Sequence, residues 1–179
     1  LIGALASLHG DDIPARLVMI GGRVGSSDPT NAAYAVRIDE QIERLGLASY
    51  VHWTGFVADE AVAAWLDAAD VVVLPFRDGA SYRRGSLMAA IQHARPIVTT
   101  QPVVDIPTFR DGENMLLVPP DQPSVLARAL RRVNADVELR QHLAAGAAEL
   151  RAEFDWERIA RACAAHYEQI IQARREVTP

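Results

Sequence analysis

The residues Val71-Val72-Val73-Leu74, followed by Pro75, are the clearest indication of fold class in this chain. Four consecutive apolar residues, most of them β-branched, predict a strand buried on both faces, as the strands of parallel sheets are. Pro75 ends the strand because proline has no N–H for the hydrogen-bond ladder. The rest of the chain is therefore expected to supply further parallel strands and the helices that cover them.

Strand and helix patterns alternate on the N-terminal side of this stretch. Short apolar runs predict strands over 17–20 and 51–54. Helical spacing predicts helices over 1–9, over 31–45 with Asn31 as N-cap, and from the N-cap Asp59 onward, with a loop over 25–29. This alternation is typical of an α/β domain with right-handed crossovers.

The C-terminal side continues the same alternation and then becomes helical. We expect a helix over 86–93, strands over 96–99 and 115–118, and three closing helices. Two of these helices carry apolar faces made of Leu126, Leu130 and Val133, and of Leu139, Leu143 and Leu150. The third carries Trp156, Ile159, Cys163, Tyr167 and Ile170, among which Cys163 is interpreted as a core residue.

Composition excludes several classes of function. The 179 residues are 50% hydrophobic and 23% charged, which suits one globular domain. The 18 basic and 23 acidic residues give a net charge of −5, so nucleic acid is not an expected partner. All basic residues are Arg, which excludes a lysine Schiff base or a P-loop lysine. The single cysteine excludes an internal disulfide, and no apolar run reaches the ~20 residues of a membrane span.

The loop after the strand at 71–74 is the strongest candidate site. It reads Arg77-Asp78-Gly79-Ala80-Ser81-Tyr82-Arg83-Arg84-Gly85-Ser86 and leads into a helix. Ligands bind parallel sheets at the carboxyl ends of the strands. The N–H groups of Ser86, Leu87 and Met88 lie at a helix start, where they have no intrahelical partner and attract an anion such as phosphate. Gly85 allows a ligand to approach the backbone closely.

Two adjacent arginines can strengthen this anion site through charged hydrogen bonds. Neighbouring loop residues rarely point the same way, so we expect one arginine to face the ligand and the other to face solvent or Asp78. Arg84 is expected to face the ligand because it is nearer the helix start than Arg83. The alternative interpretation is a surface loop whose arginines are solvated or pair with nearby Asp.

Other motifs are weaker. Gly21-Gly22 does not complete G-x-G-x-x-G, so a nicotinamide dehydrogenase is disfavoured and a tight turn is favoured over a specific contact. The five histidines are scattered, without metal-ligand spacing, and we expect no metal. The segment 111–114 is interpreted as a turn.

The order of these patterns resembles the C-terminal, nucleotide-sugar-binding half of GT-B glycosyltransferases of family 4. The matching segments are 17–22 (Leu-Val-Met-Ile-Gly-Gly), 51–55 (Val-His-Trp-Thr-Gly), 70–75 (Asp-Val-Val-Val-Leu-Pro), 94–98 (Ala-Arg-Pro-Ile-Val), 111–114 (Asp-Gly-Glu-Asn), 116–120 (Leu-Leu-Val-Pro-Pro) and 154–160 (Phe-Asp-Trp-Glu-Arg-Ile-Ala). Each segment is weak alone, but together they cover nearly the whole chain in the order found in the family.

The resemblance implies a Rossmann-like, doubly wound parallel sheet with helices on both faces. It implies that residues 1–179 form a single donor-binding domain, a fragment that lacks the N-terminal acceptor domain and begins after the first strand of its own half. The donor is then a UDP-, GDP- or ADP-sugar, transfer usually retains anomeric configuration, and no cofactor or essential metal is needed. A cytoplasmic enzyme is expected, and a peripheral membrane location of the full-length protein is left open.

The resemblance also implies a site. Diphosphate contacts are expected from Arg83 to Leu87, the base beside Gly55-Phe56-Val57, and the sugar facing Asp78 to Ser81. The candidate substrate-binding residues are Gly21, Gly22, Gly55, Phe56, Val57, Asp78, Gly79, Ser81, Arg83, Arg84, Gly85, Ser86 and Leu87. No catalytic residue is assigned, and the sequence does not name the acceptor.

One departure from the family concerns two glutamates, which often flank the turn into this helix. The corresponding positions here are Ser81 and Ala89, so both carboxylates are absent. Ala89 cannot accept a hydrogen bond from ribose, and Ser81 can contact a sugar only through a neutral hydroxyl. A non-catalytic binding module with a degenerate donor site is therefore the main alternative. A sugar-nucleotide epimerase is disfavoured because the expected cleft lacks a catalytic carboxylate and histidine.

The last helix is expected to make a contact outside this domain. In the resembling family this segment crosses back to the other domain, so part of the stripe from Trp156 to Ile170 is expected to be exposed or covered by a second copy of the chain. The alternative is that the stripe packs wholly on its own sheet.

Overall fold

A computed structural model describes residues 1–22 and 29–177. The strands are β1 (Leu17–Met19), β2 (Val51–Trp53), β3 (Val72–Leu74), β4 (Ile97–Thr100) and β5 (Leu116–Val118). The α-helices are α1 (Ile2–Gly10), α2 (Pro29–Arg44), α3 (Asp59–Ala68), α4 (Gly85–Gln92), α5 (Pro123–Ala135), α6 (Val137–Arg151) and α7 (Trp156–Val177). Short 3-10 turns cover Ala48–Tyr50 and Ala152–Phe154. The predicted alternation of strands and helices is confirmed.

The described strands form two parallel sheets. β1 pairs with β2 in one sheet, and β3, β4 and β5 follow one another in the second. Val73 lies opposite Val98, and Val98 opposite Leu116, so the three-stranded sheet is in register across its width. The α/β class with parallel strands is confirmed, and in the described residues the sheet is divided between β1 and β3.

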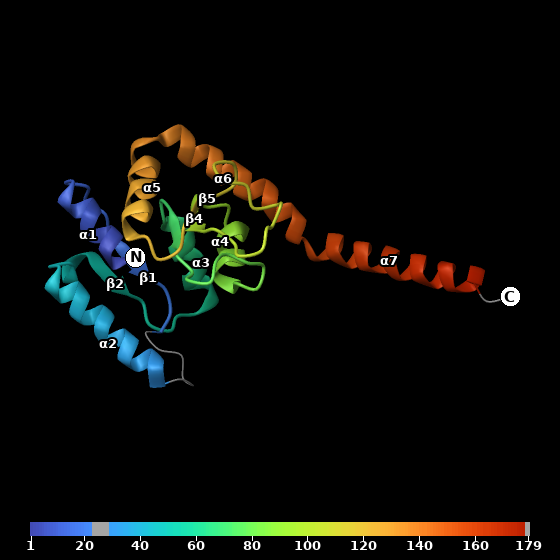
Figure 1. The fold of residues 1–179 in the computed structure, drawn as a ribbon, viewed down its shortest axis with the longest axis horizontal. Helices are drawn as coiled ribbons and strands as arrows, with labels where there is room; N and C mark the ends of the chain where they lie inside the picture. Colours follow the sequence, from blue (N-terminus) through green and yellow to red (C-terminus); the bar gives the residue numbers. More distant parts are fainter. Residues whose placement is uncertain (23–28, 178–179) are drawn as a thin grey trace.

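Helices cover both faces of the three-stranded sheet (Figure 1). Val98 of β4 packs with residues of α1 and α5, while its neighbour Ile97 packs with residues of α4. Successive side chains of a strand point to opposite faces, which is why adjacent residues enter different clusters. α6 contributes Leu143 to the first cluster and Leu150 to the second, so this helix extends past both layers.

Most predicted core positions are buried. The six predicted leucine and valine positions of α5 and α6 are buried, and Val98 and Leu143 have no exposed surface. The strand at 71–74 departs from expectation because its residues are only half-buried. β3 lies at the edge of its sheet, so a neighbouring strand covers it on one side alone.

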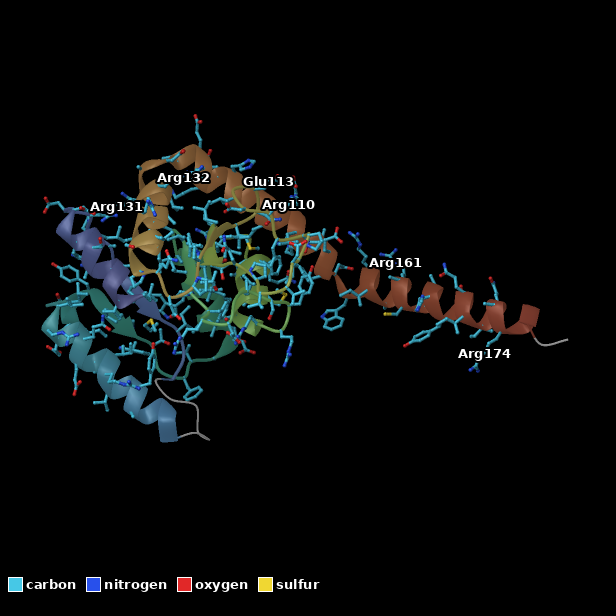
Figure 2. All side chains as sticks on the ribbon, viewed as in Figure 1. Arg110, Glu113, Arg131, Arg132, Arg161 and Arg174 are labelled. Atoms are coloured by element: carbon cyan, nitrogen blue, oxygen red, sulfur yellow. The ribbon has the colours of Figure 1, made fainter. Side chains whose placement is uncertain are left out.

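The predicted helix over 156–170 forms, but it leaves the body of the molecule. α7 projects as a long, separate helix, with Arg161 and Arg174 along it (Figure 2). Trp156 is 81% exposed and Tyr167 is 65% exposed. The alternative in which the whole stripe packs on its own sheet is therefore wrong. The interpretation of Cys163 as a core residue is also wrong, since this cysteine is exposed.

Two predicted N-caps are corrected. α2 begins at Pro29, two residues before Asn31, because proline suits the first turn of a helix. Residues 25–28 of the predicted loop lie outside the described residues. α3 begins at Asp59 itself, with Ala58 as N-cap and no side-chain cap. In the part of the chain that the structure describes, no helix combines the length and apolarity needed to cross a membrane.

Candidate functional site

The segment after β3 is held against the end of β4. The N–H of Ala80 donates a hydrogen bond to the Thr100 carbonyl, and the Thr100 hydroxyl donates to the carbonyl of Phe76 at 2.7 Å. The Thr99 hydroxyl donates to the Leu74 carbonyl at 2.7 Å. Thr99 and Thr100 are almost fully buried, so these bonds fix the loop to the carboxyl edge of the sheet. The anchoring role of Thr99 and Thr100 was not predicted from sequence, although two hydroxyls at a strand end were a usable signal.

Gly79 is required by the path of this loop. Its φ is +78°, and a Cβ there would lie 2.6 Å from the carbonyl oxygen of Gln101. Residues with a Cβ avoid this φ, and a Cβ at this position would clash with the main chain of Gln101. Gly79 therefore has a structural role, whatever ligand binds nearby.

Arg84 is the arginine that contacts Asp78. The two side chains form an ion pair, and the guanidinium lies 4.8 Å from the centroid of the Phe76 ring. Arg83 is exposed to solvent, which is one of the two positions expected for it, and Asp78 pairs with Arg84 instead of Arg83. Whether Arg84 also faces a ligand stays a prediction.

The start of α4 is partly open. The N–H groups of Leu87 and Met88 both donate to the carbonyl of Arg84, so the prediction that these two amides lack partners is wrong. Leu87 is fully buried, whereas Gly85 and Ser86 are exposed. A Cβ on Gly85 would meet nothing within 4 Å. The backbone of Gly85 and Ser86 is therefore the accessible part of this turn.

The other predicted loops come together at the carboxyl ends of β1 and β2. Gly21 forms an isolated bridge with Gly55, and its N–H donates to the Thr54 hydroxyl at 3.0 Å. Gly21 has φ +109° and Gly55 has φ +67°, which confirms the tight turn predicted at Gly21. Both loops therefore lie at one strand edge, as the sequence predicted.

Phe56 is the most exposed ring of this edge, at 90% exposure. Its ring lies against Gly22, where a Cβ would come within 2.6 Å of it. Gly22 thus leaves room for the aromatic ring, and Val57 follows half-buried. An exposed aromatic face of this kind can stack on a planar ligand such as a nucleobase.

The structure joins the predicted site residues into two groups. One group lies at the carboxyl ends of β1 and β2, and the other lies between β3 and α4. A separate surface hollow, at the far end of α4, is lined by Gln92, Ala148, Arg151, Ala152, Asp155, Arg158 and Arg161. That hollow contains none of the predicted site residues. Among the described residues, no three His, Cys, Asp or Glu side chains gather as metal ligands do.

A parallel α/β domain with glycine turns at its strand ends has the architecture of the Rossmann-like half of GT-B glycosyltransferases. This chain belongs to the family described as Glycosyl transferases group 1, which matches residues 1–136. It is 29% identical to a D-inositol 3-phosphate glycosyltransferase of Streptomyces bingchenggensis, over 99% of this chain and 38% of the relative. The chain therefore spans well under half the length of that relative.

Solved structures share the fold. The HepE structure from Anabaena in complex with UDP superposes with a TM-score of 0.81 at 22% identity, covering 94% of this chain and 44% of that one. A sucrose-phosphate synthase from Thermosynechococcus elongatus gives a TM-score of 0.73 at 29% identity, covering 96% of this chain and 42% of that one. The predicted fold class is confirmed by both.

Proposed function

We propose that this chain is the donor-binding half of a nucleotide-sugar-dependent glycosyltransferase. The observation that carries the proposal is the accessible backbone of Gly85 and Ser86 at the start of α4, directly after Arg84. Amide N–H groups, the positive end of the helix dipole and a guanidinium together suit a diphosphate. Membership in the family and the UDP bound to the structurally similar HepE support this choice.

The rest of the donor is assigned to the neighbouring loops. The base is proposed to stack beside Phe56, whose exposed ring supports this assignment. The sugar is proposed to face the segment from Asp78 to Ser81, which is anchored to the end of β4. The base and diphosphate positions lie after different strands, so a donor must extend along the carboxyl edge.

The chemistry proposed is sugar transfer with retention and without an essential metal or cofactor. As the bond to the sugar breaks, the leaving diphosphate gains negative charge, and fixed donors at the start of α4 stabilise it. Loss of one such donor raises the barrier by about 3 kcal/mol. The acceptor is assigned to an N-terminal domain, so residues 1–179 alone are expected to bind nucleotide weakly and to transfer no sugar.

The test is calorimetric titration of UDP, GDP and ADP into the full-length protein and its variants. Arg84→Ala and Gly85→Val are expected to weaken binding of the preferred nucleotide. Arg128→Ala, which removes an exposed arginine of α5, is the matched control and is expected to bind normally. Unchanged affinity in both Arg84→Ala and Gly85→Val would remove this turn from the site and, with it, the main support for donor binding.

A non-catalytic binding module is the second candidate. The specific observation behind it is Ala89, a half-buried residue of α4 that has no group to bind ribose hydroxyls. If the full-length protein binds a nucleoside diphosphate but transfers no sugar from the corresponding nucleotide sugar, this candidate replaces the first.

A further inference from the structure

The surface hollow at the C-terminal ends of α4 and α6 takes no part in the proposed function. Its volume is about 460 Å³, within the range of about 300–1,000 Å³ that small-molecule sites occupy. Most of its lining side chains are polar or charged, namely those of Gln92, Arg151, Asp155, Arg158 and Arg161. Ordinary small-molecule pockets are mostly apolar, so this hollow is suited to a strongly polar ligand.

The bend between α6 and α7 forms the hollow. Leu150 of α6 is buried in the cluster that contains Ile91 of α4, so the end of α6 is held against α4. Asp155 then adopts an extended conformation, with φ −66° and ψ 125°, and α7 turns away from the body of the molecule (Figure 1). The short side chains of Ala148 and Ala152 leave room inside this bend. The hollow is therefore a consequence of helix packing and of the change in chain direction at Asp155.

The hollow is positively charged on a chain that is negative overall. Three guanidinium groups and one carboxylate line it, which gives a local charge of +2. The whole chain has a net charge of −5. A phosphomonoester carries a charge of about −1.5 to −2 at pH 7, so one such group would neutralise the hollow.

Two of the three guanidinium groups are not occupied by a carboxylate. Arg158 pairs with Glu153 at 2.9 Å. Within the described part of the chain, neither Arg151 nor Arg161 forms an ion pair, and each donates instead to one backbone carbonyl at 3.3 Å. A guanidinium has five N–H donors, so both arginines keep most of their donors for a ligand. Arg161 lies near the start of α7, where Figure 2 labels it.

Asp155 is the one carboxylate in the described lining of the hollow, and it has a structural role of its own. It accepts a hydrogen bond from the N–H of Arg158 at 3.0 Å, as an N-cap residue does. Asparagine caps helices about as well as aspartate and carries no charge. The charge of Asp155 can therefore be removed while its capping bond is kept.

We propose that this hollow binds a phosphomonoester, with Arg151 and Arg161 donating hydrogen bonds to the phosphate oxygens. The planar fork of an arginine matches two oxygens of a phosphate group. The proposed diphosphate turn lies at the other end of α4, about 10 Å away along the helix. The hollow is thus a second anion site, which goes beyond the proposed donor binding and does not depend on it.

The test is calorimetric titration of inorganic phosphate into the full-length protein at constant ionic strength. Arg161→Gln and Arg151→Gln are each expected to weaken phosphate binding about tenfold, since a charged hydrogen bond is lost. Asp155→Asn is expected to strengthen binding about two- to threefold, because it removes a like charge and keeps the cap. Arg128→Gln, which removes an exposed arginine of α5, is the matched control and is expected to bind normally.

These titrations can support or overturn the proposal. Weaker binding in both arginine variants, together with normal binding in the control, supports it. Absence of phosphate binding, or wild-type affinity in both Arg151→Gln and Arg161→Gln, overturns it. Equal losses in Arg161→Gln and Arg128→Gln also overturn it, because they would indicate attraction to the overall charge. Phosphate binding that saturating UDP abolishes would place the anion at the start of α4, which overturns the second site and leaves the proposed function intact.

Two further arms identify the source of the phosphate group. Glycerol 3-phosphate represents a soluble phosphomonoester, and vesicles of phosphatidylcholine with phosphatidic acid present the same group as a lipid headgroup. Binding that Arg161→Gln weakens supports the proposal in either arm, and the arm that binds names the source. Absence of binding in both arms overturns a phosphomonoester as the ligand. Circular dichroism of each variant confirms that a lost affinity does not come from a lost fold.

Discussion

Arg84 forms an ion pair with Asp78, and its guanidinium lies over the ring of Phe76. The arginine proposed to bind diphosphate is thus paired with a carboxylate of its own loop. The Asp78 side chain is 74% exposed, and exposed ion pairs contribute about 0–1 kcal/mol, so an incoming diphosphate can displace it.

We expect Arg84→Ala to weaken nucleoside diphosphate binding by about 1.5–3 kcal/mol, the scale of a charged hydrogen bond. Arg83→Ala should weaken nucleoside diphosphate binding less than Arg84→Ala, because Arg83 is exposed and lies further from the helix start. Calorimetric titration of the full-length protein measures both variants. A larger loss in Arg83→Ala would reverse the assignment of the two arginines.

Asp78→Asn tests whether the Asp78 carboxylate competes with the ligand for Arg84 or contacts the donor directly. If Asp78 competes with the ligand for Arg84, the amide should bind Arg84 more weakly and diphosphate affinity should rise about two- to fivefold. Affinity is compared in the same titration at low and high salt, where the gain should shrink with screening. Weaker binding in Asp78→Asn would instead show that the carboxylate contacts the donor.

Gly79 and Gly85 are expected to respond differently to substitution. Gly79→Ala should destabilise the fold by about 1–3 kcal/mol, because alanine is strained at φ +78° and its Cβ would press on the Gln101 carbonyl. Gly85→Val meets open space and should leave the melting temperature nearly unchanged while blocking nucleotide binding. Urea unfolding of both variants, followed by titration, checks this contrast. Equal stability losses would contradict it.

Asn114 is expected to stabilise the turn before β5. Its side chain is buried, accepts from the N–H of Arg110 at 2.9 Å and donates to the carbonyl of Thr108 at 2.8 Å. Asn114→Ala should lower the free energy of unfolding by about 2–3 kcal/mol, since both bonds are lost.

The adjacent Glu113 provides the control for Asn114. It forms an exposed ion pair with Arg110, and both residues are labelled in Figure 2. Glu113→Gln should lower the free energy of unfolding by less than about 1 kcal/mol. Urea unfolding is the measurement, and a Glu113→Gln cost equal to that of Asn114→Ala would contradict the role of burial.

Substitution by alanine should destabilise the fold more at Phe154 than at Trp156, although the two residues are close in sequence. Phe154 packs against the cluster around α4 and meets Tyr82 edge-on, with ring centroids 5.5 Å apart. Phe154→Ala should therefore cost about 2 kcal/mol of stability. Trp156→Ala should cost less than about 0.5 kcal/mol, because its side chain is exposed. If α7 contacts a second copy or an N-terminal domain, Trp156→Ala should instead weaken that association in sedimentation.

Several predictions from sequence were accurate because they depended on local physics. Continuous apolar runs placed β1 to β5 within a residue or two, and the spacing of Leu126, Leu130 and Val133 identified the buried face of α5. The tight turn at Gly21 was predicted from the glycine pair that follows the first strand, and its φ of +109° agrees. The start of α4 followed from a strand, a polar loop and an apolar run.

Other features could not be read from the sequence. The amphipathic pattern of α7 resembles that of a core helix, yet Trp156 and Cys163 are exposed, because a pattern does not show what packs against it. Likewise, nothing in Arg83-Arg84 shows which guanidinium meets Asp78. That choice depends on the position of Phe76 and on the ion pair across the loop.

Local sequence patterns were enough to predict the class of the domain, the order of its elements and the loops at its strand ends. These follow from hydrophobic period, glycine and proline, which act over a few residues. Only contacts in the folded molecule set β1 and β3 apart, bring Gly79 against Gln101 and leave most of α7 exposed within the described chain. Those outcomes depend on contacts between residues far apart in the chain, which a local pattern does not encode.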